Sequence, residues 1–172
     1  MSQRPSKEEY HPNLEQYIGL IGEERIVELI AAQTEETSAI LASLTDEQGD
    51  YRYAPGKWSL KEAIGHITDA ERVMSYRLLR IARGDKTPLP GFDQDIFAEH
   101  ASFSAWSAAQ LLEDYRAVRQ ATLTLLRGLA AEAWTRIGVC NGCDTSARAL
   151  AYVIAGHERH HLNIIREKYL NG

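Results

Sequence analysis

The chain has 172 residues and a formal net charge of −5. Its apolar share of 44% and charged share of 25% are ordinary for a soluble globular protein, so global disorder is excluded. The acidic balance argues against a nucleic-acid binder, because binding to phosphates requires a basic face.

The chain also lacks the marks of a membrane or secreted protein. No apolar run approaches the roughly 20 residues that cross a bilayer, and the first residues do not resemble a signal peptide. Two cysteines are too few for a disulfide scaffold. We therefore expect a cytoplasmic protein with one domain over residues 1–172, of which residues 1–20 form an N-terminal arm.

Two helices are predicted in the first half of the chain. Apolar residues recur at helical spacing over Glu23–Leu44, after a polar start through Pro12 that we expect to be an irregular arm or a short turn. Ser59 with Glu62 forms a capping box, which predicts that a second helix starts there and stops at Gly84.

The second half of the chain predicts a long connection and two more helices. Residues 85–103 contain two prolines and a glycine, which cannot continue a helix, so we expect a crossover. Ser107 with Gln110 forms another capping box, for a helix that reaches Leu129. The last helix begins after a cap at Thr145 or Ser146 and reaches Tyr169.

No alternating stretch is long enough to predict a sheet. The fold class expected is all-α, a four-helix bundle with a long crossover between its second and third helices.

A pair of histidines in the last predicted helix carries the chemistry. His157 and His161 are four residues apart on the apolar stripe of that helix, so both imidazoles can reach one ion. The alternative is that both are core histidines bonded to carbonyl groups. His66, in the second predicted helix, also faces the core, and its presence favours a metal site over two core histidines. Three neutral imidazoles can bind one ion and still leave it open to water or substrate.

Other metal motifs overlap this pair. His157-Glu158-Arg159-His160-His161 matches the zinc-protease string, but the usual downstream ligand is absent. Cys140 and Cys143 precede the pair at the spacing of a Cys2His2 finger, but here the helix belongs to a larger acidic domain. A redox role for the two cysteines also lacks its usual βαβ context, so we expect them to be loop residues near the site.

The remaining histidines and several acids are weaker candidates. His160 is about 100 degrees from the stripe, and His11 and His100 lie in polar stretches, so we expect these three nearer the surface. Asp69 and Asp93 are the candidates for an added base, although each is equally consistent with a solvated surface acid. Asp95, like Asp69 and Asp93, could hydrogen-bond a ligand imidazole or a bound water, or could equally be a solvated surface acid.

Three segments resemble the DinB-like superfamily, including its YfiT-type members, which are assigned as metal-dependent hydrolases by analogy. They are the run 53–59 (YAPGKWS), the run Gly65-His66-Ile67 with Asp69, and the run 149–161 that ends in the histidine pair. The resemblance covers about residues 20–170.

The resemblance implies a four-helix bundle that holds a zinc or nickel ion on His66, His157 and His161, and often a homodimer. It implies a hydrolase, or a thiol S-transferase that uses a low-molecular-weight thiol such as bacillithiol or mycothiol. In either enzyme the ion would activate water or the thiol, and the substrate would be a small molecule. The alternative is a non-catalytic, stress-associated bundle that only binds metal.

Overall fold

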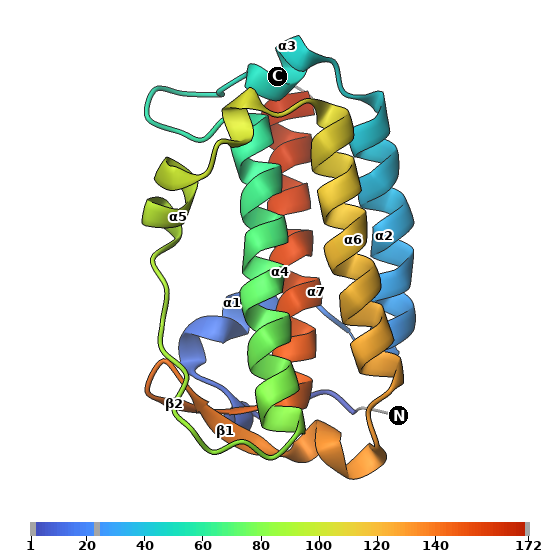
Figure 1. The fold of residues 1–172 in the computed structure, drawn as a ribbon, viewed down its shortest axis with the longest axis vertical. Helices are drawn as coiled ribbons and strands as arrows, with labels where there is room; N and C mark the ends of the chain where they lie inside the picture. The colour runs from blue at the N-terminus through green and yellow to red at the C-terminus, as the bar shows by residue number, and fades with distance from the viewer. Residues whose placement is uncertain (1–2, 23–24, 171–172) are drawn as a thin grey trace.

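Four long helices form the body of the computed structural model, which describes residues 3–22 and 25–170 (Figure 1). They are α2 (Ile26–Ser43), α4 (Leu60–Ala82), α6 (Ala108–Arg127) and α7 (Ala147–Ile164), the last extended by a π-helical stretch over Ile165–Leu170. In Figure 1, α2 and α7 run upward while α4 and α6 run downward. The predicted all-α four-helix bundle is confirmed.

The crossover follows from the parallel direction of α4 and α6. The chain leaves α4 at the lower end of the bundle and must return along its whole length before α6 can begin (Figure 1). The crossover contains the short helix α5 (Gln94–His100) and a 3-10 turn, Phe103–Ala105. It is therefore less irregular than we expected, because the Asp93 side chain accepts bonds from the Asp95 and Ile96 amides and starts α5.

Side-chain caps set the helix starts largely as predicted. Both capping boxes, at Ser59 and at Ser107, are present, and Ser146 rather than Thr145 caps α7. A third box, at Thr45, starts the short helix α3 (Asp46–Asp50). The predicted start of the first long helix at Glu23 lies outside the described residues.

The expectation that the chain has no sheet is wrong over residues 137–146. Strands β1 (Ile137–Cys140) and β2 (Cys143–Ser146) pair antiparallel, with Cys140 opposite Cys143. The turn residues Asn141 and Gly142 have φ of 50° and 77°, as a tight two-residue hairpin requires. Four-residue strands are too short to show alternation in the sequence, which is why the pattern missed them.

The N-terminal arm is also more ordered than predicted. Two 3-10 turns, Lys7–Glu9 and Pro12–Leu14, lead into α1 (Glu15–Ile18), which packs on α7. Ile18 and Ile21 are buried there. A Cβ on Gly156 would lie 2.1 Å from the Tyr17 carbonyl oxygen, so the arm approaches α7 at the one position without a side chain.

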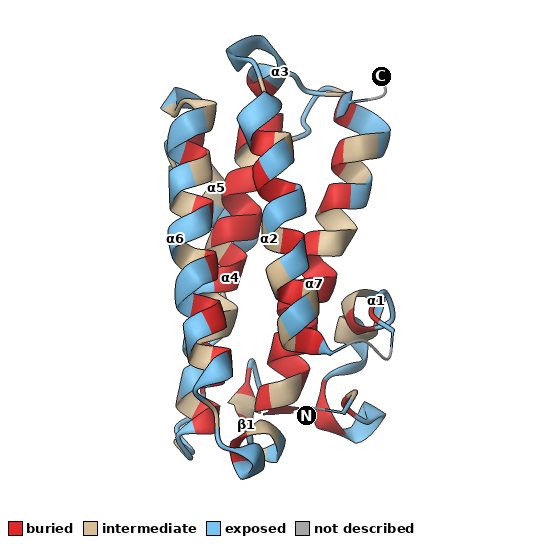
Figure 2. Cartoon of the chain, turned by 90° about the vertical axis from the view of Figure 1, so that its right-hand side faces the viewer, coloured by how far each residue is buried: buried red, intermediate tan, exposed pale blue. Residues whose placement is uncertain are grey.

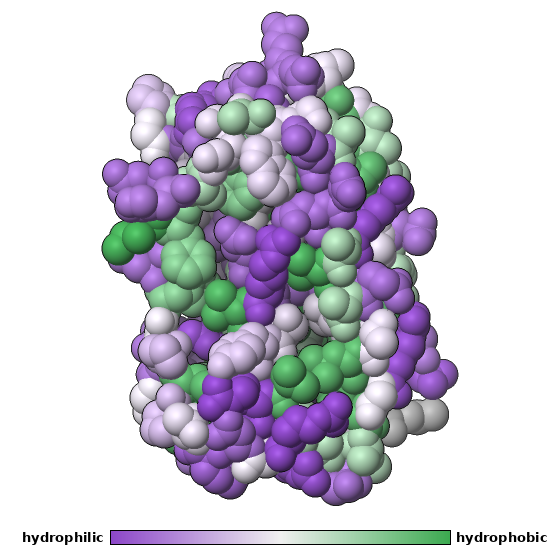
Figure 3. All heavy atoms as spheres, viewed as in Figure 1, coloured by the Kyte–Doolittle hydropathy of each residue, from purple (hydrophilic) through white to green (hydrophobic). Residues whose placement is uncertain are grey.

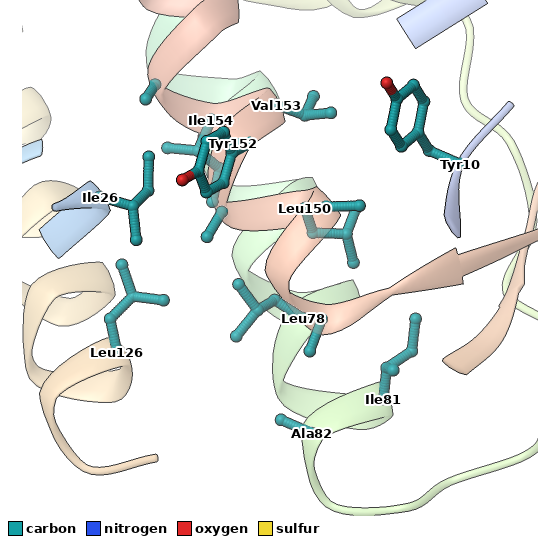
Figure 4. Packing of buried hydrophobic residues seen from close by; sticks show 14 of the residues in the cluster. Tyr10, Ile26, Leu78, Ile81, Ala82, Leu126, Leu150, Tyr152, Val153 and Ile154 are labelled. Carbon is teal, nitrogen blue, oxygen red and sulfur yellow. The ribbon is translucent and has the colours of Figure 1, made fainter. Parts of the chain in front are cut away.

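Helix α7 is the centre of the apolar core. Eight consecutive residues of α7, Ala151 to Glu158, are buried, and Figure 2 shows this helix largely in red. In Figure 4, Leu150 and Ile154 of α7 lie near Leu78 of α4 and Ile26 of α2. A second apolar cluster, which includes Leu60, Phe103 and Leu162, lies toward the other end of the bundle.

A buried polar network joins all four long helices. Arg119 of α6 is fully buried and contacts Glu158 of α7 and Glu71 of α4, each at 2.7 Å. Arg119 also donates to the Ile30 carbonyl of α2 at 3.2 Å. Tyr115 and Thr37 donate to the same Glu158 oxygen at 2.6 and 2.7 Å. Glu158 therefore accepts hydrogen bonds from two neighbouring helices.

No helix in the described part of the chain is long and apolar enough to cross a membrane. On the face shown in Figure 3, hydrophobic residues form separate patches among hydrophilic ones.

Replacement of Glu158 by Gln is expected to lower the free energy of unfolding by about 3 kcal/mol or more, because it leaves the buried Arg119 charge with Glu71 alone. Urea denaturation measures the change. Glu36→Gln is the matched control, since Glu36 pairs with Arg166 on another helix in an exposed position and should cost under about 1 kcal/mol. Equal effects of the two substitutions would contradict a structural role for Glu158.

Candidate metal centre

Three histidines from two antiparallel helices converge inside the bundle. His66 comes from α4, and His157 and His161 come from successive turns of α7. One nitrogen from each imidazole lies within 4.8 Å of the others. The Nε2 atoms of His66 and His157 are 3.1 Å apart. The structure thus brings together the three residues that the sequence predicts as ligands.

Burial keeps these imidazoles neutral. His66 is 4% exposed and His157 is 8% exposed. Burial lowers the pKa of His66 to about 4, with Asp95 opposing the change, and lowers the pKa of His161 to about 3. The pKa of His157 lies well below its usual value because of burial and the neighbouring His161 and His66. At neutral pH all three nitrogens can bind a metal ion.

The spacing of the nitrogens fits a single transition-metal ion. Two ligands at roughly 2.0–2.1 Å from a tetrahedral zinc lie about 3.3 Å apart, close to the 3.1 Å between the His66 and His157 nitrogens. Among the described residues, no cysteine or carboxylate joins this group. The protein therefore offers three neutral nitrogen ligands.

Glu158 faces away from the histidine cluster. Its two carboxylate oxygens accept bonds from Tyr115, Thr37 and Arg119, so they are engaged in the core network. In a zinc protease the glutamate of the same string acts as a general base on water. Here it is a structural acid, which leaves the protease interpretation without a base.

The two cysteines also lie away from the cluster. Cys140 and Cys143 are free thiols on the hairpin and line a cavity with Leu150, about two turns before His157 on α7. The expectation that they lie near the site is wrong, and the Cys2His2 finger has no structural basis.

The other histidines occupy the positions that the sequence suggested. His160 is half-buried, and its ring contacts the rings of Tyr17 and His161. His11 and His100 are exposed. His11 caps the turn Pro12–Leu14, and a ring nitrogen of His100 contacts the Ile96 carbonyl.

The two acids considered as bases have other partners. Asp69 pairs with Arg72, which also pairs with Asp114 on α6. Asp93 caps α5. Asp95, two residues further along, is the acid whose charge acts on His66, and it lines a cavity with His161. Sequence reasoning weighed Asp95 only as a possible hydrogen-bond partner, since nothing in the sequence fixes which turn of α5 faces the bundle.

A cavity of about 250 Å³ opens beside His161. Its wall includes Trp58, Tyr53 and Tyr169, with Asp95 on the crossover side. The Trp58 ring lies 4.7 Å from that of His66, centroid to centroid. The cavity therefore has aromatic walls, and it makes the cluster accessible to a small molecule at His161.

Comparison with known proteins agrees with this geometry. The family model described as the DinB superfamily matches residues 29–165, which cover α4, α6 and α7 in full and all but the first three residues of α2. The chain belongs to the DinB superfamily. The match includes His66, His157 and His161, so the three-histidine cluster lies within the part of the chain that defines the family.

Two relatives have informative names. A Bacillus pumilus protein named "Putative metal-dependent hydrolase" is 29% identical over 146 residues, covering 82% of this chain and 81% of its own length. An Oceanobacillus iheyensis protein with the same description is 28% identical over 142 residues, covering 80% and 79%. These names and the three-histidine cluster support a divalent metal ion in this DinB protein.

A solved structure confirms the fold. YfiT from Bacillus subtilis, described as "a probable metal-dependent hydrolase with an unusual four-helix bundle topology", superposes with a TM-score of 0.69. It is 17% identical, and the alignment covers 97% of this chain and 92% of YfiT.

The lowered histidine pKa values predict how metal-free protein responds to acid. Histidines in the unfolded chain bind protons below about pH 6.5, whereas His66 does so only near 4, so the unfolded state binds more protons between these values. The stability that the neutral His66 side chain contributes is present above pH 6.5 and is lost as the pH falls toward 4. From His66 the loss is roughly 3 kcal/mol.

Urea denaturation of chelator-treated protein at several pH values between 7 and 4 measures this dependence. The free energy of unfolding should change less steeply with pH in the His66→Phe variant than in the parent, because the variant lacks the His66 imidazole. The carboxylates contribute equally to both proteins. His100→Phe is the control, since His100 is exposed. Parallel slopes for the parent and His66→Phe would contradict the buried, neutral state of His66.

Proposed function

We propose that this DinB protein is a metal-dependent enzyme that acts on a small molecule, either as a hydrolase or as a thiol S-transferase. His66, His157 and His161 would hold one zinc or nickel ion. When bound, such an ion lowers the pKa of a coordinated water or thiol and supplies a nucleophile near neutral pH.

The observation that carries the proposal is the open side of the cluster. Structural zinc is usually saturated by four protein ligands, whereas catalytic zinc keeps a position for water or substrate. In the described residues the cluster has three ligands, and the cavity beside His161 leads to it. This favours an enzyme over the non-catalytic, stress-associated alternative, which would need a further protein ligand such as Cys140.

The residues around the cavity have separate tasks. Trp58 and Tyr169 provide an apolar wall for the substrate, and Tyr169 is held by its hydroxyl, which donates to the Trp58 carbonyl at 2.8 Å. Asp95 supplies a carboxylate to the same lining, and we assign it the transfer of a proton to or from the reacting group. Asp95 takes the place of Asp69 and Asp93, both of which have structural partners.

A hydrolase and a thiol S-transferase would use the same cluster and differ in their second substrate. A hydrolase turns over an ester or amide without added thiol. A transferase consumes a low-molecular-weight thiol such as bacillithiol or mycothiol. A thiol reagent measures the loss of this free thiol. The relatives' names favour the hydrolase.

Metal content tests the ligand assignment. Protein incubated with zinc and freed of excess ion should contain about one ion per chain, and His157→Ala should contain almost none while it keeps its helical circular dichroism. His160→Ala is the matched control, because His160 is on the same helix but outside the cluster, and it should keep its metal. Stoichiometric metal in folded His157→Ala would end the assignment.

Asp95→Asn should lower kcat about 10²- to 10⁴-fold in whichever of the two assays shows turnover, with metal content unchanged. Glu99→Gln, on the same short helix, is the control and should leave kcat near that of the parent. A kcat of Asp95→Asn equal to that of Glu99→Gln would exclude Asp95 as the acid or base.

Two further properties belong to this proposal. A homodimer is supported by exposed apolar side chains, of which Tyr76 and Leu79 lie on α4 and Ile96 and Phe97 on α5. A cytoplasmic location is supported by the free thiols of Cys140 and Cys143, which a reducing compartment preserves.

A further inference from the structure

A second cavity, of about 260 Å³, lies at the lower end of the bundle in Figure 1 and is separate from the histidine cluster. Its wall comes from α4, the start of the crossover, the hairpin, the N-terminal arm and the first turn of α7. Two α4 residues line it, Met74 and Arg77, and Arg77 is 11 residues from His66, which is about 16 Å along the helix axis.

Arg77 is a buried cation without a carboxylate partner. It is 7% exposed, and no carboxylate in residues 3–22 or 25–170 lies within ion-pair distance of it. The other buried cations of the described chain are paired: Arg119 contacts Glu71 and Glu158, and Lys61 contacts Asp50 at 2.9 Å. A buried charge is costly unless it is paired, so the unpaired Arg77 requires an explanation.

The contacts of Arg77 hold it in place without neutralising it. One terminal nitrogen donates to the Pro90 carbonyl at 2.6 Å, the other lies 3.7 Å from the Met74 sulfur, and the guanidinium lies over the Phe92 ring. A guanidinium has five N–H donors, and within the described chain these two atoms are its only acceptors. The remaining donors are free for a ligand.

The cavity is formed before any ligand binds. The Leu89 amide donates to the Val139 carbonyl and the Asn141 amide donates to the Leu89 carbonyl, both at 2.9 Å, so the crossover is bonded to the hairpin. A Cβ on Gly91 would lie 2.6 Å from the Asn141 side-chain oxygen, so the crossover approaches the hairpin where a side chain is absent. Rigid walls lower the entropy cost of binding.

The chemistry of the lining selects one class of ligand. Leu14, Phe92 and Leu150 provide apolar surface, and Asn13 and Asn141 provide polar groups. Arg77 is the only lysine or arginine in the lining, which matches one negative charge rather than the two of a phosphate. The planar guanidinium fork also matches a carboxylate in a bidentate pair.

We propose that this cavity binds a small organic acid, whose carboxylate pairs with Arg77 and whose apolar body lies against Phe92 and Leu150. The site needs no metal ion and does not rest on the proposed function of the histidine cluster. The competing explanation is that Arg77 only anchors the crossover to α4 through Pro90 and Phe92.

Isothermal titration of the protein as purified, with phenylacetate, tests the proposal. Phenylacetamide is the neutral probe of the same shape, and inorganic phosphate is the second anion. Phenylacetate should bind at least about tenfold more tightly than either one, because charge-assisted hydrogen bonds contribute roughly 1.5–3 kcal/mol. Absence of saturable phenylacetate binding at tens of millimolar, or tighter Arg77-dependent binding of phosphate, would overturn the proposal.

Two variants separate a binding role from an anchoring role. Arg77→Met should weaken phenylacetate binding at least about tenfold, whereas Arg83→Met, an equal charge change at the exposed C-cap of the same helix, should not. Unchanged affinity in folded Arg77→Met overturns the proposal, even if its melting temperature falls. If Arg77→Met does not fold, Arg77→Lys is the second variant, because it keeps the positive charge but lacks the planar guanidinium. It should weaken phenylacetate binding several-fold, and unchanged affinity would overturn the proposal.

A chelator distinguishes this site from the histidine cluster. Phenylacetate bound at Arg77 should keep its affinity after metal removal, whereas a carboxylate bound to an ion at His66, His157 and His161 would lose it. Binding that is lost on chelation and kept in Arg77→Met overturns the proposal and leaves the metal centre intact. If the histidine cluster binds no metal, the metal content of the protein would show it, and phenylacetate binding at Arg77 would be unaffected.

Discussion

The buried contact between Arg119 and Glu158 fixes the rotation of α7, and the candidate site depends on that rotation. Glu158 follows His157 directly, so the two side chains point about 100 degrees apart on the helix. With Glu158 bonded to Arg119, Tyr115 and Thr37, α7 turns its next face, which carries His157 and His161, toward His66 on α4. A rotation of α7 by one residue would break the network and separate the imidazoles from His66.

The same network shows how the bundle accommodates charge in its core. Burial raises the pKa of Glu71, while Arg119 opposes the change, so Glu71 favours a protonated form more than an exposed glutamate does. Arg119 contacts both Glu71 and Glu158, so one buried guanidinium serves two buried carboxyl groups. The histidines are kept neutral by burial, so none of the three candidate ligands carries a formal charge. A dicationic ion among neutral ligands binds hydroxide or thiolate more strongly than it would among carboxylates.

The sequence predicts those parts of the molecule that depend on local rules. The capping boxes at Ser59 and Ser107 follow from spacing within one helical turn, and the pairing of His157 with His161 follows from the helical repeat. The direction of Glu158 was not predictable, because its partners are 39 or more residues away on other helices. The hairpin was missed because its four-residue strands are too short to show alternation and its pairing with Leu89 is a tertiary contact, although the Asn141-Gly142 dipeptide is a local signal for such a turn. The packing of the arm on Gly156 is likewise a tertiary contact.

The order of the helices accounts for both cavities. Because α4 and α6 run in parallel, the chain must return along the bundle, and this return passes over two regions of α4. At its start the crossover brings Pro90 and Phe92 to Arg77, and a few residues later α5 brings Asp95 to the cavity beside His161. An up-down bundle with short loops would leave both regions open to solvent. The crossover therefore supplies a wall for each cavity, and because only Asp93 and Gln94 lie between Phe92 and Asp95, one short segment shapes both sites.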